Sequence, residues 1–140
     1  MKFSDLPVFG AAPSELTFSS GPEGAVVTGC SRNVTQVSVP ASHGGVPVIA
    51  IGEGAFREHP YLLSVTLPDS VRRIGESAFM DCHSLMHVLG GAGIAQVGPY
   101  AFYQCVNLRT VELPGRPEAA RTSFAGCYQL GAANEPVTYR

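Results

Sequence analysis

The chain has 140 residues, of which 45% are hydrophobic and 14% charged, so it is long enough for one domain with a buried core and too short for two. Nine Lys and Arg against eleven Asp and Glu give a formal net charge of −2, so we expect no nucleic-acid partner and no electrostatic attachment to anionic lipid. No run reaches the roughly 18 apolar residues of a membrane span and no signal peptide is present, so we expect no membrane insertion and a cytoplasmic location for the sequence as written.

The first predicted element is a β-hairpin near the N-terminus. The β-prone runs 16–18 and 25–28 flank residues 19–24, which are rich in Ser, Gly and Pro. We expect this hairpin to cap the N-terminal end of the fold, and we assign residues 1–33 to an N-terminal segment that contains it.

From residue 34 onwards the sequence repeats itself with a period of about 23 residues. The period is clearest for four phenylalanines spaced 23, 23 and 22 residues apart, Phe56, Phe79, Phe102 and Phe124. It also relates four leucines, Leu62, Leu85, Leu108 and Leu130, and three cysteines, Cys82, Cys105 and Cys127. His59 takes the cysteine position in the first copy. We divide residues 34–130 into one degenerate leading turn and three fuller copies, the last one irregular, and leave 131–140 as a C-terminal tail.

Each copy contains two short extended segments and a corner. The first segment alternates apolar residues, as in Val65 and Leu67, and ends at Pro68. The second precedes a glycine, as in 71–74 before Gly75, and the glycine turns the chain into an Ala-Phe corner that we expect to be a short 3₁₀ or helical piece.

No copy buries its apolar residues alone, so neighbouring copies must stack at roughly the 4.8 Å strand spacing. The predicted fold class is therefore a repeat solenoid, mainly β, with short helical or 3₁₀ corners. Two irregularities stand out. Gly90-Gly91 replaces the Leu-Pro that ends the strand in the other copies, which predicts a weaker strand. Residues 117–120 depart from the pattern, which predicts an incomplete C-terminal cap.

The repeated string Ile-Gly-x-x-Ala-Phe-x-x-Cys-x-x-Leu-x-x-Val-x-Leu-Pro resembles the BspA-like, or Treponema-type, leucine-rich repeat. One copy carries it from Ile74-Gly75 to Val88, and the next from Gly98 to Pro114. The resemblance implies a curved, right-handed solenoid with an N-terminal β-hairpin cap, whose Leu-x-x-Val-x-Leu strands line a concave sheet. It also implies a bacterial binding protein, often adhesin-like and displayed on the surface or secreted, which is the alternative to a cytoplasmic location.

The cysteines and histidines invite a catalytic or metal-binding reading, which the pattern does not favour. Three of the four cysteines follow the repeat period, as expected for buried, reduced thiols, and no Cys-x-x-Cys pair is present. His83 and His87 are four residues apart, but this segment runs from a corner into a strand, so the two side chains diverge. We expect no catalytic residue, no metal and no cofactor; a redox-thiol protein or enzyme is the alternative from another class.

The remaining candidate site is the surface of the sheet. Alternation along the strands places eight side chains outward on the expected concave face: Gln36, Ser38, Ser64, Thr66, His87, Leu89, Thr110 and Glu112. Leu63, Met86 and Arg109 are predicted to flank it. We expect a protein partner of unknown identity, with two alternatives: solvated sheet residues without a role, or a structural spacer. Phe124 and Leu130 are predicted at an open end that could support end-to-end homo-oligomers.

Overall fold

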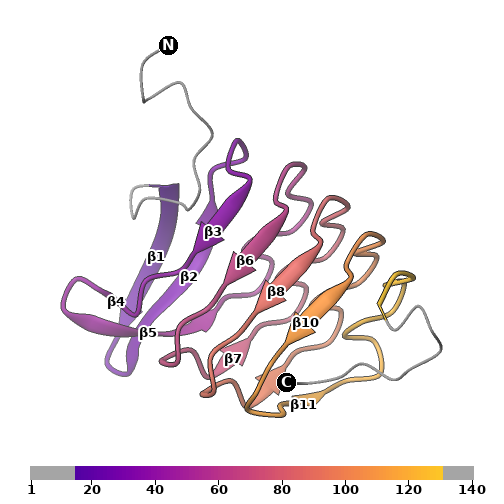
Figure 1. Cartoon of the computed structure of the whole chain (residues 1–140). Coiled ribbons are helices and arrows are strands. Elements are labelled where there is room, and N and C mark those ends of the chain that lie inside the picture. The colour runs from indigo at the N-terminus through magenta and orange to yellow at the C-terminus, as the bar shows by residue number, and fades with distance from the viewer. Residues whose placement is uncertain (1–14, 131–140) are drawn as a thin grey trace.

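The computed structural model describes residues 15–130, which form two sheets that run the length of the molecule (Figure 1). The smaller sheet has the order β10-β8-β6-β3 and the larger has the order β1-β2-β5-β7-β9-β11, with β4 paired to β5. The strands of the smaller sheet are β3 (Gln36–Ser38), β6 (Ser64–Thr66), β8 (His87–Leu89) and β10 (Thr110–Glu112). Those of the larger are β1 (Leu16–Gly21), β2 (Gly24–Cys30), β5 (Val46–Ile51), β7 (Arg73–Ile74), β9 (Gln96–Val97) and β11 (Glu118–Ala119), and β4 is Ser42–His43.

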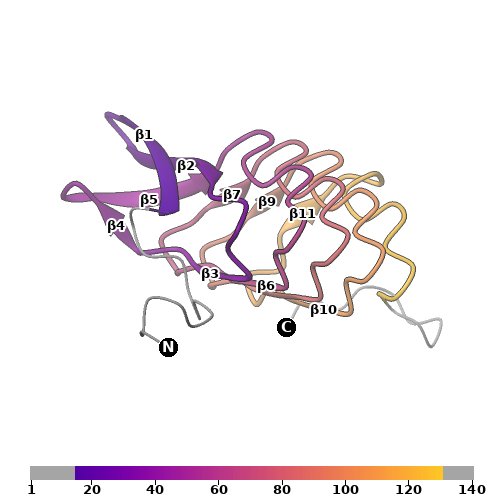
Figure 2. The same ribbon diagram turned by 90° about the horizontal axis from the view of Figure 1, so that it is seen from above.

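Successive turns of the chain each add one strand to each sheet (Figure 2). All pairings within the smaller sheet are parallel, and so are those from β2 through β5, β7 and β9 to β11. The predicted N-terminal hairpin is present as the antiparallel pair β1–β2, and β2 then pairs in parallel with β5. The predicted β-solenoid is thereby confirmed.

The corners contain no helix, so the prediction of short helical or 3₁₀ corners is wrong. In the corner after Gly75, the N–H groups of Ala78 and Met80 close turns three residues long, at 3.2 and 3.1 Å. The N–H groups between them donate to the next copy instead; that of Phe79, for example, reaches the carbonyl of Ala101 at 2.7 Å. A 3₁₀ helix would keep these donors for itself. Residues Ser77 and Asp81 adopt left-handed φ angles of 57° and 58° in this corner.

The phenylalanines form one continuous stack through the interior. Ring centroids are 4.8 Å apart for Phe56 and Phe79, 5.1 Å for Phe79 and Phe102, and 5.2 Å for Phe102 and Phe124, with the planes within 4° of parallel. Leu62, Leu85 and Leu108 are fully buried beside the stack. The stack therefore repeats at the strand spacing, as the sequence period predicts.

Gly90 and Gly91 do not weaken β8, contrary to the prediction. β8 pairs over three residues with both β6 and β10, as its neighbours do. A Cβ atom at Gly90 would lie 2.4 Å from Leu113 Cδ2, and one at Gly91 would lie 2.6 Å from the backbone of Asp69. The glycines are thus required because neighbouring copies approach this point too closely for a side chain.

The two ends of the solenoid are also ordered by specific contacts. Near the N-terminal end the extra residues of the first copy form the β4–β5 hairpin, whose turn residues Gly44 and Gly45 have φ angles of 59° and 82°. At the other end β11 pairs with β9, and the buried Ser123 hydroxyl accepts the Ala120 N–H at 2.9 Å and donates to the Gly98 carbonyl at 2.8 Å. The last copy is therefore more regular than the prediction of an incomplete cap implies. Within residues 15–130, no helix is long and apolar enough to span a bilayer.

Candidate functional site: the four-strand face

The outward surface of β3, β6, β8 and β10, which we call the four-strand face, is made of two straight rows of side chains. Between them lies an inward row of valines that the strand register aligns, Val37, Val65, Val88 and Val111. The first outward row is Gln36, Ser64, His87 and Thr110. The second outward row is Ser38, Thr66, Leu89 and Glu112. All eight predicted residues are thus brought together on one face, although their role in binding stays a prediction.

The four-strand face is small, polar and nearly neutral. Its main apolar side chain is Leu89, which is 41% exposed. Glu112 is half-buried, and His87 is exposed beside Leu89 on β8. Within residues 15–130 the single ion pair, His83 with Asp81 at 3.8 Å, lies in a corner and away from this face. The face therefore offers flat contact area with one apolar centre and one carboxylate.

A third line of residues borders the face where the strands begin; we call it the edge row, formed by Thr35, Leu63, Met86 and Arg109. Each carbonyl in it accepts two N–H groups from the next copy: that of Leu63 accepts Met86 N–H at 2.8 Å and His87 N–H at 3.2 Å, and that of Met86 accepts Arg109 N–H at 2.9 Å. Leu63, Met86 and Arg109 thus flank the face as predicted. Thr35 was missed, because the insertion in the first copy shifts its spacing to Leu63 from 23 residues to 28.

The cysteines form a buried ladder of reduced thiols. The Sγ atoms of Cys82, Cys105 and Cys127 donate to the phenylalanine carbonyls of the preceding copies at 2.9, 3.0 and 3.0 Å. The pKa of Cys105 is raised because it hydrogen-bonds with the Cys127 and Cys82 thiols and is buried. Burial, together with the charge of Glu15, raises the pKa of Cys30 to about 11. Such thiols are poor nucleophiles, which fits a structural role.

His59 fills the cysteine position of the first copy and joins the hairpin segment to it. Its Nε2 lies 2.8 Å from the Ser31 carbonyl, and its Nδ1 accepts the Leu62 N–H at 3.1 Å. The ring is therefore neutral with its proton on Nε2. Burial lowers the pKa of His59, with a smaller lowering from the charge of Arg32, while the bond to Ser31 opposes both. Sequence analysis noted the exchange of Cys for His but did not assign it this bridging position.

The predicted assembly end lies in the last described copy. Phe124 and Leu130 are half-buried and pack against the core, and Phe124 stacks on Phe102. The tail 131–140 lies outside the described residues, so end-to-end association stays a prediction. Among residues 15–130, no group of three His, Cys, Asp or Glu side chains is arranged to hold a metal ion.

The stacked copies, with one short strand per copy in each sheet and a leucine and phenylalanine core, define a leucine-rich-repeat solenoid. Comparison with known families agrees with this class. Residues 30–138 match the BspA type leucine rich repeat region, in six copies, and the chain belongs to that family. No curated protein matches the sequence.

Three solved structures show the same fold. A leucine-rich repeat protein of T. pallidum is 26% identical with a TM-score of 0.81 over 86% of this chain, which spans 58% of that protein's length. One from Bacteroides capillosus is 26% identical with a TM-score of 0.78, covering 95% of this chain and 99% of that one. A leucine rich cell surface protein of Faecalibacterium prausnitzii is 29% identical with a TM-score of 0.71, covering 91% of this chain and 36% of that one.

Proposed function

We propose that this chain is a non-enzymatic protein-interaction module and that its partner contacts the four-strand face. The observation that carries the proposal is the strict register of the two outward rows, which assembles eight side chains from four copies on one continuous surface. Small polar side chains around the exposed Leu89 provide contact area without a nucleophile or a charged cluster. Such a surface suits docking of a protein segment better than chemistry on a small molecule.

The size of the face limits how strongly it can bind. Four strands at about 4.8 Å and three residues at about 3.3 Å give roughly 200 Å². A stable interface buries about 800 Å² on each partner. Binding through the two outward rows alone is therefore weak, and a tighter complex also needs contacts beyond them, of which the edge row is the nearest.

The test compares two variants that each place a carboxylate on an exposed strand position. Leu89→Glu alters the four-strand face, and Gln96→Glu alters β9 in the larger sheet. Peptides selected from a phage-displayed random library on the folded chain are measured against both. We expect most clones to lose at least tenfold in affinity for Leu89→Glu and to keep it for Gln96→Glu. Clones that bind both variants equally would place the interaction surface elsewhere and overturn the proposal.

A location on the cell surface is a second proposal, favoured by one observation. The F. prausnitzii relative carries the name cell surface protein and aligns with 91% of this chain. Its alternative, a cytoplasmic location, is separated by treating intact source cells with a protease and probing the chain with an antibody. Digestion in intact cells supports surface display; digestion only after lysis supports the cytoplasmic alternative.

A further inference from the structure

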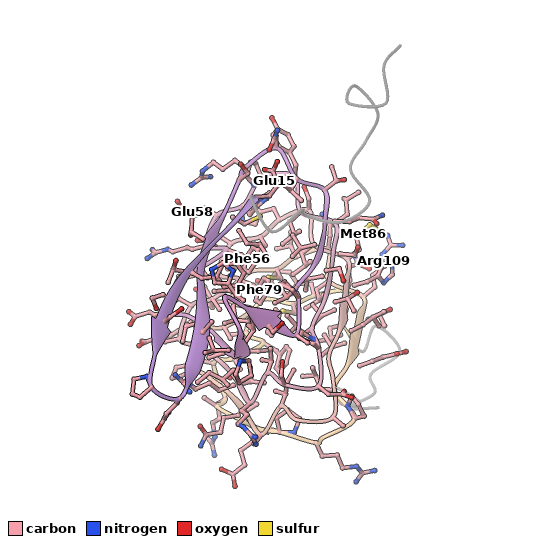
Figure 3. All side chains as sticks on the ribbon, turned by 90° about the vertical axis from the view of Figure 1, so that its left-hand side faces the viewer. Glu15, Phe56, Glu58, Phe79, Met86 and Arg109 are labelled. Atoms are coloured by element: carbon pink, nitrogen blue, oxygen red, sulfur yellow. The ribbon has the colours of Figure 1, made fainter. Side chains whose placement is uncertain are left out.

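The edge row combines two neighbouring apolar side chains with a cation. Leu63 is 41% exposed and Met86 is half-buried, and they lie in consecutive copies. Arg109 follows in the next copy; it is exposed and forms no ion pair with any residue between 15 and 130. Figure 3 shows Met86 and Arg109 together on one side of the molecule. The edge row thus offers an apolar surface that ends in an unpaired positive charge.

The spacing of this row selects the kind of chain that fits it. Neighbouring copies are 4.8 to 5.2 Å apart where the phenylalanine stack measures them. In an α-helix, residues i, i+3 or i+4, and i+7 lie on one side at rises of about 0, 4.5 to 6.0, and 10.5 Å. Same-side residues of an extended strand are about 6.6 Å apart and fall out of step after one copy. A helix along the solenoid axis therefore meets each copy with one side chain.

We infer that the edge row receives an α-helix of the partner protein, with apolar side chains at i and i+3 or i+4 against Leu63 and Met86, and an Asp or Glu at i+7 against Arg109. A helix is about 10 to 12 Å wide, so it also covers the first outward row, where Ser64 and His87 can contact its flank. The inference rests on the proposed function and names the class of partner. A helix that lies on a surface through i, i+3, i+4 and i+7 is a known mode of recognition.

The test uses a peptide designed from this spacing and the whole chain. An 18-residue helical peptide of alanine and glutamine, closed by a lactam on its far side, carries Leu at i and i+4 and Glu at i+7. A control peptide of the same composition places the two Leu and the Glu at i, i+2 and i+5, which spreads them around the helix. Fluorescence anisotropy is expected to show at least tenfold tighter binding for the designed peptide.

Charge exchange tests the contact with Arg109 separately. Arg109→Glu should weaken the designed peptide at least tenfold, and changing the peptide's Glu to Lys should restore binding to that variant. Arg57→Glu is the matched control, because Arg57 is also exposed but lies in the first corner. Circular dichroism checks that each variant is folded.

Three outcomes would overturn the inference: equal binding of the two peptides, no binding of either, or the same loss for Arg57→Glu as for Arg109→Glu. Library clones that still depend on Leu89 would then leave the proposed function standing without its helical partner. If no clone depends on Leu89, the proposed function fails regardless of the peptide result.

Discussion

The bond network of His59 predicts that stability falls when the solution becomes mildly acidic. Nδ1 can accept the Leu62 N–H only while it is unprotonated. Protonation leaves that buried N–H without an acceptor, which costs about 1 to 3 kcal/mol, and places a positive charge near Arg32. The pKa of His59 is lowered on folding, so the unfolded chain takes up the proton first, and unfolding becomes easier as the pH drops below about 6.5. Above that pH the contribution of His59 is fully present.

The measurement is urea denaturation at pH 8 and pH 5 for the wild type and for His59→Cys. Cysteine is the residue that the other copies use, and there the carbonyl of the cysteine accepts the corresponding leucine N–H, as in Cys82 with Leu85 at 3.2 Å. The variant does not protonate in this range, so we expect the wild type to lose about 1 to 3 kcal/mol more than the variant between the two pH values. Equal losses in both proteins would refute the reasoning, because the other titrating groups are shared.

Three further changes test the packing. Phe79→Ala removes the middle of the aromatic stack and should cost about 3 to 5 kcal/mol, seen as a lower urea midpoint; a loss no larger than that of Phe124→Ala, at the half-buried end, would contradict the continuous stack. Gly91→Ala should cost about 1 to 3 kcal/mol because its Cβ meets the Asp69 backbone, while Gly21→Ala, with nothing within 4 Å, should be close to neutral in the same assay. Cys30, with a pKa of about 11, should react with a disulfide reagent at pH 8 at least about tenfold more slowly than an exposed cysteine, and a rate typical of free cysteine would show that it is not shielded.

The repeat period alone was enough to place the site. Once Val65, Val88 and Val111 are aligned as inward residues, alternation sends their neighbours outward, and the structure has the outward residues in these positions. The strands could be predicted because each is defined by residues within one copy and by the identical demand of the next copy. The period also predicted the close stacking of the phenylalanines.

What the sequence did not reveal depends on contacts between copies at positions with no constant residue type. The left-handed corner positions hold Gly54, Ser77 and Tyr100 in successive copies, so no pattern marks them. They adopt this backbone because alternate N–H groups must reach the next copy. Gly91 resembles a defect in the pattern, and only the backbone of Asp69 beside it explains the glycine. His59 could have been found from its one distinctive signal, a titratable residue in a buried cysteine position.

The β4–β5 hairpin shows where this architecture accommodates changes of length. Five additional residues in the first copy are absorbed by a hairpin at the side of the stack (Figure 2), and β3 still meets β6 in register. Gain or loss of a whole copy leaves the pairing rules of the others unchanged, since each copy contacts its immediate neighbours. Genes of this kind can thus evolve by two separate routes: duplication of whole units lengthens the surface, and short insertions at a corner diversify its margin without shifting the side chains already in line.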